Sequence, residues 1–169
     1  TAIRFSPDGR VFVTEKSGLI KVFASLSATT PTVFHDLRTN VHNFWDRGLM
    51  GLALHPNFPT VPSVYVLYTY DKDPNNAQVP RWGTAGATSD GCPTPPGPTT
   101  NGCVVSGRLS RLELDVSSGQ NVSTGTESVL IEGWGQQFPG HSMNTVMFGP
   151  DGALYASAGD GASFNFTDY

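Results

Sequence analysis

His141 and Asp160 are the two residues whose types and spacing could perform acid–base chemistry. They flank two apolar segments separated by Pro-Asp-Gly, within GHSMNTVMFGPDGALYASAGDG at residues 140–161. That pattern predicts a β-hairpin, and the open ends of an antiparallel pair are neighbours. A carboxylate bound to one imidazole nitrogen would fix the tautomer and support the imidazolium that a general base forms. The alternative is that both residues merely flank strands, where histidines and aspartates are common.

A second candidate cluster lies in NFWDRGLMG, residues 43–51, just before another predicted strand. Phe44 and Trp45 could stack on a planar cofactor or a sugar ring, and Asp46 and Arg47 could hydrogen-bond polar groups of a ligand. In the competing interpretation the aromatic rings pack between structural units. Asp46 and Arg47 then pair with each other or face water.

The remaining polar motifs favour structural roles. DKDPNN at residues 71–76 alternates oxygen ligands but lacks the glycine and the final acidic residue of a calcium-binding EF-hand loop, so it predicts a solvated turn. His35 ends a predicted strand and His55 lies in a turn. His42 lies nearer the suspected site without an evident partner in the sequence.

The elements that must position these residues form a repeat. Phe-x-Pro-Asp-Gly followed by alternating apolar residues occurs at 3–15 and 146–158, and residues 51–70 follow the same scheme with a longer turn. Two further predicted strands follow each of the first two hairpins, at 18–24 and 30–37 and at 106–115 and 126–134. The step from Pro7 to Pro56 is 49 residues, close to the length of a propeller blade.

The sequence therefore predicts an all-β fold, a β-propeller of four-stranded antiparallel blades. About two and a half blades are present. We expect blade one at about 1–40, blade two at about 48–135 with an insertion at about 71–105, and the first half of blade three at about 141–169. A propeller needs four to eight blades to close, which predicts a longer polypeptide. A compact β-sandwich that reuses hairpins is the alternative.

Cys92 and Cys103 enclose a loop rich in proline, glycine and threonine, and we expect them to form a disulfide. A disulfide favours a secreted or periplasmic protein. The net charge of −4, without a basic cluster, argues against nucleic acid as a partner. No run of about 18 apolar residues is present, so no membrane span is expected. No signal peptide is visible, and the abrupt start inside a predicted strand favours a trimmed or fragmentary chain.

DRGLMGLALHPNF, FSPDG followed by VFVTEKSG, and GHSMNTVMFGPDGALYASAGDG together resemble the glucose/sorbosone dehydrogenase family. The resemblance covers the chain except the cysteine-bearing insertion. It implies a six-bladed propeller whose enzymes use pyrroloquinoline quinone (PQQ) and usually calcium. It also implies that His141 takes the proton of a sugar's anomeric hydroxyl and that Asp160 orients His141. Asp46 stands where the family's glucose dehydrogenases place a glutamine that contacts the cofactor, so quinone binding there would need Arg47 or a metal to compensate the carboxylate.

From this resemblance we expect the N-terminal part of a secreted, PQQ-dependent sugar dehydrogenase. Its substrate would be a small sugar, and an external electron acceptor would complete the redox cycle. The resemblance places the family's remaining cofactor contacts and calcium ligands in later blades, so this part alone should be inactive. The rival hypothesis is a propeller that binds carbohydrate or protein and has lost the redox site.

Overall fold

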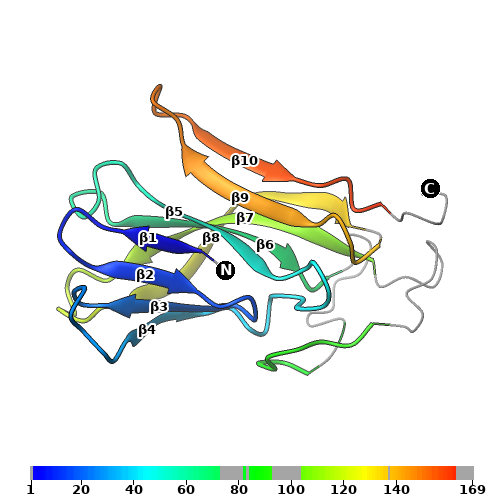
Figure 1. The fold of residues 1–169 in the computed structure, drawn as a ribbon, viewed down its shortest axis with the longest axis horizontal. Helices are drawn as coiled ribbons and strands as arrows, with labels where there is room; N and C mark the ends of the chain where they lie inside the picture. Colours follow the sequence, from blue (N-terminus) through cyan, green and yellow to red (C-terminus); the bar gives the residue numbers. More distant parts are fainter. Residues whose placement is uncertain (1, 73–81, 83, 93–103, 137, 163–169) are drawn as a thin grey trace.

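The fold was determined as a computed structural model, which describes residues 2–72, 82, 84–92, 104–136 and 138–162. Those residues form ten β-strands and no helix (Figure 1). None of them, accordingly, lies in a helix long and apolar enough to cross a membrane. In chain order the strands are β1 (Ile3–Phe5), β2 (Val11–Thr14), β3 (Leu19–Phe23), β4 (Thr32–Asp36), β5 (Leu49–Leu54), β6 (Ser63–Tyr70), β7 (Val105–Leu114), β8 (Ser123–Gln136), β9 (Met143–Phe148) and β10 (Leu154–Ala158).

The strands form three antiparallel sheets, each following chain order. Two sheets have four strands, β1-β2-β3-β4 and β5-β6-β7-β8, and the third is the β9–β10 hairpin. Pro-Asp-Gly begins the turn of the first hairpin, where Gly9 has a φ of 91° and its N–H donates to Ser6 O at 2.9 Å. The last hairpin uses the same device, with Gly152 at a φ of 78°. A left-handed turn residue of this kind favours glycine because it has no Cβ.

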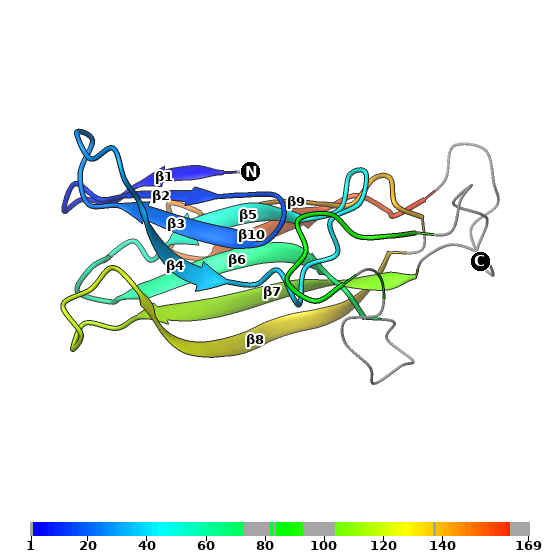
Figure 2. The same cartoon turned by 90° about the horizontal axis from the view of Figure 1, so that it is seen from below.

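The second sheet lies between the first sheet and the β9–β10 hairpin (Figures 1 and 2). One apolar cluster fills the space between the first two sheets, where the buried Phe12 ring meets Phe34 and Phe58 edge-on at centroid distances of 5.5 and 5.4 Å. A second cluster, centred on Leu67 and Val146, joins the second sheet to the hairpin. Each fully buried side chain of this size contributes roughly 1.5–3 kcal/mol to stability.

Gly51 shows how closely the second sheet and the hairpin approach. A Cβ at this position would lie 2.8 Å from Leu67 Cβ and 3.0 Å from Val146 Cγ1. Any larger residue would push β9 away from β5, and with it the segment that carries His141. The glycine therefore helps to set the position of the candidate site.

The fold is an all-β partial propeller, as the repeat predicted, with two four-stranded blades and a hairpin stacked side by side. A β-sandwich would instead have two facing sheets. The strand bounds differ most at β8, which was expected at 126–134 and spans Ser123–Gln136. Its pairing with β7 shifts register three times, so that bulges lengthen the strand. Parts of the insertion, including Cys103, lie outside the described residues, so the Cys92–Cys103 disulfide stays a prediction.

Candidate active site

The β9–β10 hairpin brings His141 and Asp160 together at its open end. His141 lies two residues before β9 and Asp160 two residues after β10. His141 Nδ1 and Asp160 Oδ1 are 3.0 Å apart. The N–H of Ala162 donates to the same carboxylate oxygen, and this bond, followed by the one from His141, lowers the pKa of Asp160. Asp160 is thus ionised at neutral pH, which assigns the imidazole hydrogen to Nδ1 and proton acceptance to Nε2.

The backbone of His141 adopts an unusual conformation for a residue with a side chain. Its φ is 49°, in the left-handed region. Its carbonyl oxygen accepts from Gly161 N at 3.0 Å. A Cβ at position 159 would lie only 2.2 Å from that oxygen, so glycine is required there. These contacts hold the backbone of His141 against the segment that directly follows the C-terminal end of β10.

Asp46 contacts the same histidine from the loop that leads into β5, the first strand of blade two. Asp46 Oδ2 accepts the backbone N–H of His141 at 3.1 Å, and the N–H of Asp46 donates to Pro139 O at 3.2 Å. Trp45, directly before Asp46, has a φ of 51°. The competing interpretation let Asp46 pair with Arg47 or face water, but the described hydrogen bonds of Asp46 go to other residues. Its carboxylate instead bonds to the candidate base's backbone.

Arg47 points into the protein interior. It is completely buried, and its Nη2 donates to Gln136 O at 2.6 Å while Nη1 lies 3.3 Å from His42 Nδ1. His42 is also buried, and its Nε2 lies 3.1 Å from Gly91 O. The sequence suggested no partner for His42, and the structure corrects this. Contact between Arg47 and a cofactor stays a prediction, for which this buried geometry offers no support.

An aromatic group lies beside Asp46. The rings of Phe44 and Trp45 are stacked, with centroids 5.6 Å apart and planes 12° apart, and Phe138 meets Trp45 edge-on at 5.9 Å. Trp45 is 55% exposed, so it is accessible to a flat ligand. Phe138 was missed in the sequence, although its place three residues before His141 was a usable signal. Burial lowers the pKa of the Lys16 amine, and the nearby carboxylate of Asp46 offsets part of this effect.

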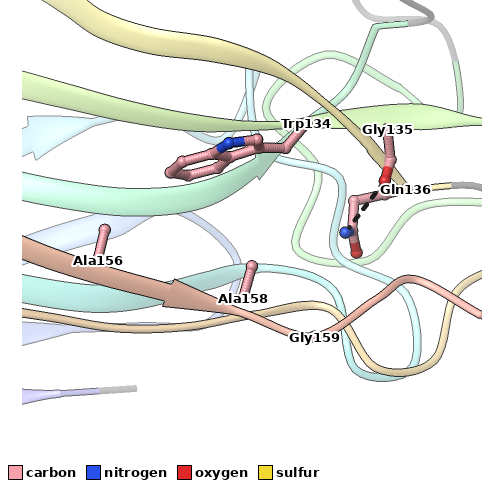
Figure 3. Close-up of a pocket in the computed structure, with 6 residues that line it drawn as sticks. All are labelled: Trp134, Gly135, Gln136, Ala156, Ala158 and Gly159. Atoms are coloured by element: carbon pink, nitrogen blue, oxygen red, sulfur yellow. Dashed lines mark hydrogen bonds between the residues drawn. The ribbon is translucent and has the colours of Figure 1, made fainter.

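A cleft of about 370 Å³ borders this site between the end of β8 and β10 (Figure 3). Figure 3 shows Trp134 projecting from β8, with the Ala156 and Ala158 side chains directed towards β8 from the facing strand. The cleft reaches the site through Gly159 but is not lined by His141 or Asp160. Among the described residues no group of three or more His, Cys, Asp or Glu side chains could hold a metal ion. Calcium binding stays a prediction.

The partial propeller carries the contact between His141 and Asp160 at the open end of its third sheet. The chain belongs to the glucose/sorbosone dehydrogenase family, whose model matches residues 1–167. A proposed oxidoreductase (glucose dehydrogenase) from Thermus thermophilus is 25% identical, with a TM-score of 0.63 over 93% of this chain and 35% of the other. The PQQ-bound aldose sugar dehydrogenase of Streptomyces coelicolor, 18% identical, shares the fold with a TM-score of 0.67 over 96% of this chain and 38% of the other.

The curated relatives are of a different kind. Hedgehog-interacting protein from Mus musculus and from Homo sapiens is 28% identical over 164 residues, which is 92% of this chain. The chain spans 20% of the length of these relatives. The chain is thus similar both to proteins whose name indicates protein binding and to structures named as sugar dehydrogenases.

Proposed function

We propose that the protein containing this chain is a PQQ-dependent sugar dehydrogenase, in which His141 is the general base and Asp160 orients it. The observation that carries the proposal is the 3.0 Å contact between His141 Nδ1 and Asp160 Oδ1 in a chain of this family. The substrate would be a cyclic aldose. An external electron acceptor would then reoxidise the cofactor.

Residues of this chain would accept the proton that the sugar loses. His141 Nε2 accepts the proton of the sugar's anomeric hydroxyl, while the Nδ1–H remains bonded to Asp160. Asp160 stays ionised and stabilises the imidazolium as it forms. PQQ, when bound, supplies the acceptor for the hydride that leaves the anomeric carbon as the carbonyl forms. Loss of one proton and one hydride balances the two-electron oxidation.

The described residues fit the flat faces of a quinone better than its carboxylates. Trp45 is exposed beside the site, and Phe138 packs against its edge, so Trp45 would hold a planar ring by stacking. The cation nearest in sequence, Arg47, is buried on Gln136 and His42 and would not meet a carboxylate. We therefore assign the quinone's cationic partners and the calcium ligands to blades outside this chain. The Cys92–Cys103 disulfide and a secreted or periplasmic location belong to the same proposal.

The experiment uses the full-length protein with PQQ and calcium added, and follows reduction of an acceptor dye with a panel of aldoses. We expect turnover with at least one aldose and its loss by about 10²-fold or more in His141→Ala. The matched control is His55→Ala, because His55 lies in a turn where its Nδ1 accepts the N–H of Asn57. Quinone binding without turnover of any aldose would refute the dehydrogenase, and full activity in His141→Ala would refute the assigned base.

The second candidate is a non-catalytic propeller that binds carbohydrate or protein. The match to Hedgehog-interacting protein favours it, as does the carboxylate of Asp46 at the family's glutamine position. The discriminating result is failure of the full-length protein to bind PQQ in a titration followed by tryptophan fluorescence. Turnover of an aldose by the protein with PQQ bound would exclude this candidate.

A further inference from the structure

Two residues in the described part of the chain have a left-handed backbone although they are not glycine. They are Trp45, with a φ of 51°, and His141, with a φ of 49°. Such conformations are uncommon for bulky residues and persist only where surrounding contacts enforce them, often at functional sites. Here the two lie on different blades, 96 positions apart, and meet through one residue.

That residue is Asp46, which follows Trp45 directly. Its carboxylate accepts the His141 N–H at 3.1 Å, and its own N–H donates to Pro139 O at 3.2 Å. The two bonds run in opposite directions between the same two segments and fix both position and orientation. The left-handed residue Trp45 directly precedes the carboxylate that accepts this bond, and the left-handed residue His141 carries the N–H that donates it.

The imidazole ring and the backbone of His141 thus have separate anchors. Asp160 binds the ring at Nδ1, whereas Asp46 binds the backbone nitrogen. Gly161 N donates to the backbone oxygen from the hairpin side. Because Asp46 lies in the loop that leads into β5, its bond makes the position of the histidine depend on how the β9–β10 hairpin is docked against blade two.

We propose that Asp46 is a positioning residue for His141, acting through the backbone of the base rather than as a ligand of the cofactor. The inference rests on the proposed function of His141. It replaces the cofactor-binding role that the family's glutamine position suggested for Asp46. In this chain, the carboxylate at that position holds the base across the blade boundary.

Asp46 also brings a second negative charge to the base. The charged groups facing the site are the carboxylates of Asp46 and Asp160 and, beyond Asp46, the amine of Lys16, which donates to Asn43 Oδ1 at 2.7 Å. Asparagine at position 46 would therefore separate the hydrogen bond to the His141 N–H from the negative charge.

The test compares Asp46→Ala and Asp46→Asn in the full-length protein. The asparagine keeps an acceptor oxygen for the His141 N–H and loses only the charge. Asp151→Ala is the matched control, since Asp151 is also exposed and its Oδ1 accepts a backbone N–H, that of Ala153, at the far end of the same hairpin. The readouts are kcat, KM, the dissociation constant for PQQ, and the histidine resonances of the cofactor-free protein labelled with 15N-histidine.

For Asp46→Ala we expect kcat to fall about tenfold or more, while KM and the PQQ dissociation constant change less than about threefold. Asp46→Asn, which keeps an acceptor oxygen, should stay within about threefold of the parent in kcat. In the cofactor-free protein, Asp46→Ala should shift the His141 amide proton upfield, because that N–H loses its acceptor. Asp151→Ala should change none of these.

Two results would overturn the inference. Weaker PQQ binding in Asp46→Ala, with His141 resonances and kcat at saturating PQQ unchanged, would make Asp46 a cofactor ligand. Unchanged His141 resonances and kinetics would leave Asp46 no role in positioning. If the parent protein oxidises no aldose, the dehydrogenase proposal fails, but the resonances of the cofactor-free protein still decide whether Asp46 positions His141.

Discussion

Arg47 donates from Nη2 to the backbone oxygen of Gln136 at 2.6 Å, joining the loop before β5 to the end of β8. Asp46, the preceding residue, binds Pro139 and His141. Consecutive residues of one loop thus hold three points along the connection from β8 to β9. Arg47 holds that connection from inside the protein, and Asp46 holds it from the solvent side.

Replacing Arg47 with alanine should destabilise the protein without a direct effect on cofactor contacts. The change removes a fully buried guanidinium and its charge-assisted bond to Gln136 O, at a cost of about 3 kcal/mol. The measurement is the free energy of unfolding of the full-length protein. Arg38→Ala is the control, because Arg38 pairs with Asp36 at the surface, where solvent screening should make the loss much smaller. An equal loss in both variants would contradict the structural role of Arg47.

Gly159→Ala should impair the candidate base while leaving the propeller folded. A Cβ at this position would lie 2.2 Å from His141 O, so the backbone of His141 must move. We expect kcat to fall about tenfold or more, with a smaller change in KM, in the dye-reduction assay. Gly135→Ala is the control, since a Cβ there meets no atom within 4 Å and the residue lies at the end of β8. Unchanged turnover in Gly159→Ala would show that the close approach is not needed.

The fold could be predicted from the sequence because its signals are local. The Pro-Asp-Gly turns and the alternation after them define hairpins within about 13 residues, and the same local pattern carried His141 and Asp160 to neighbouring ends. The proximity of those two residues needed only the pairing of one hairpin. Their catalytic role stays a prediction.

What could not be predicted depends on contacts between blades. The bond from His141 N to Asp46 spans 95 residues, and no periodicity signals it. Arg47 was expected to pair with Asp46, face water or bind a ligand because charged residues are rarely fully buried. Its burial becomes favourable only once Gln136 O is placed beside it by the long, bulged β8. The contact between His141 and Asp160 could therefore be predicted, whereas the bonds that reach this segment from the loop before β5 could not.

Asp8 should contribute to stability in a pH-dependent way. Its hydrogen bonds from the Arg10 side chain, including Nε at 2.9 Å, lower its pKa from 3.8 to about 2. A carboxyl group whose pKa is lower in the folded state stabilises above the unfolded value, and this stability is lost as the pH falls from about 4 to about 2. Because the side chain is 28% exposed, solvent screening limits the effect to about 1 kcal/mol. Urea unfolding at pH 5 and pH 2 should show a smaller acid loss in Asp8→Asn than in the parent, and equal losses would contradict the assignment.

Glu127 should stabilise blade two through its hydrogen bonds. Its Oε1 accepts from Tyr68 Oη at 2.5 Å and Ser110 Oγ at 2.6 Å, and its Oε2 accepts from Asn40 at 3.2 Å. The carboxylate therefore joins three strands of the second sheet to the loop after β4 of the first.

Glu127→Ala removes the carboxylate that accepts the hydrogen bond of the fully buried Tyr68 hydroxyl. The variant should therefore lower the free energy of unfolding by about 3 kcal/mol. Glu127→Gln keeps one acceptor oxygen but presents amide hydrogens to donors, and should lose about half as much. Phenylalanine at position 68 supplies the decisive comparison, because Tyr68→Phe removes the donor that Glu127→Ala would strand. If Glu127 acts through this bond, the double variant should lose less than the sum of the two single losses. Additive losses would show that the two side chains stabilise the blade independently.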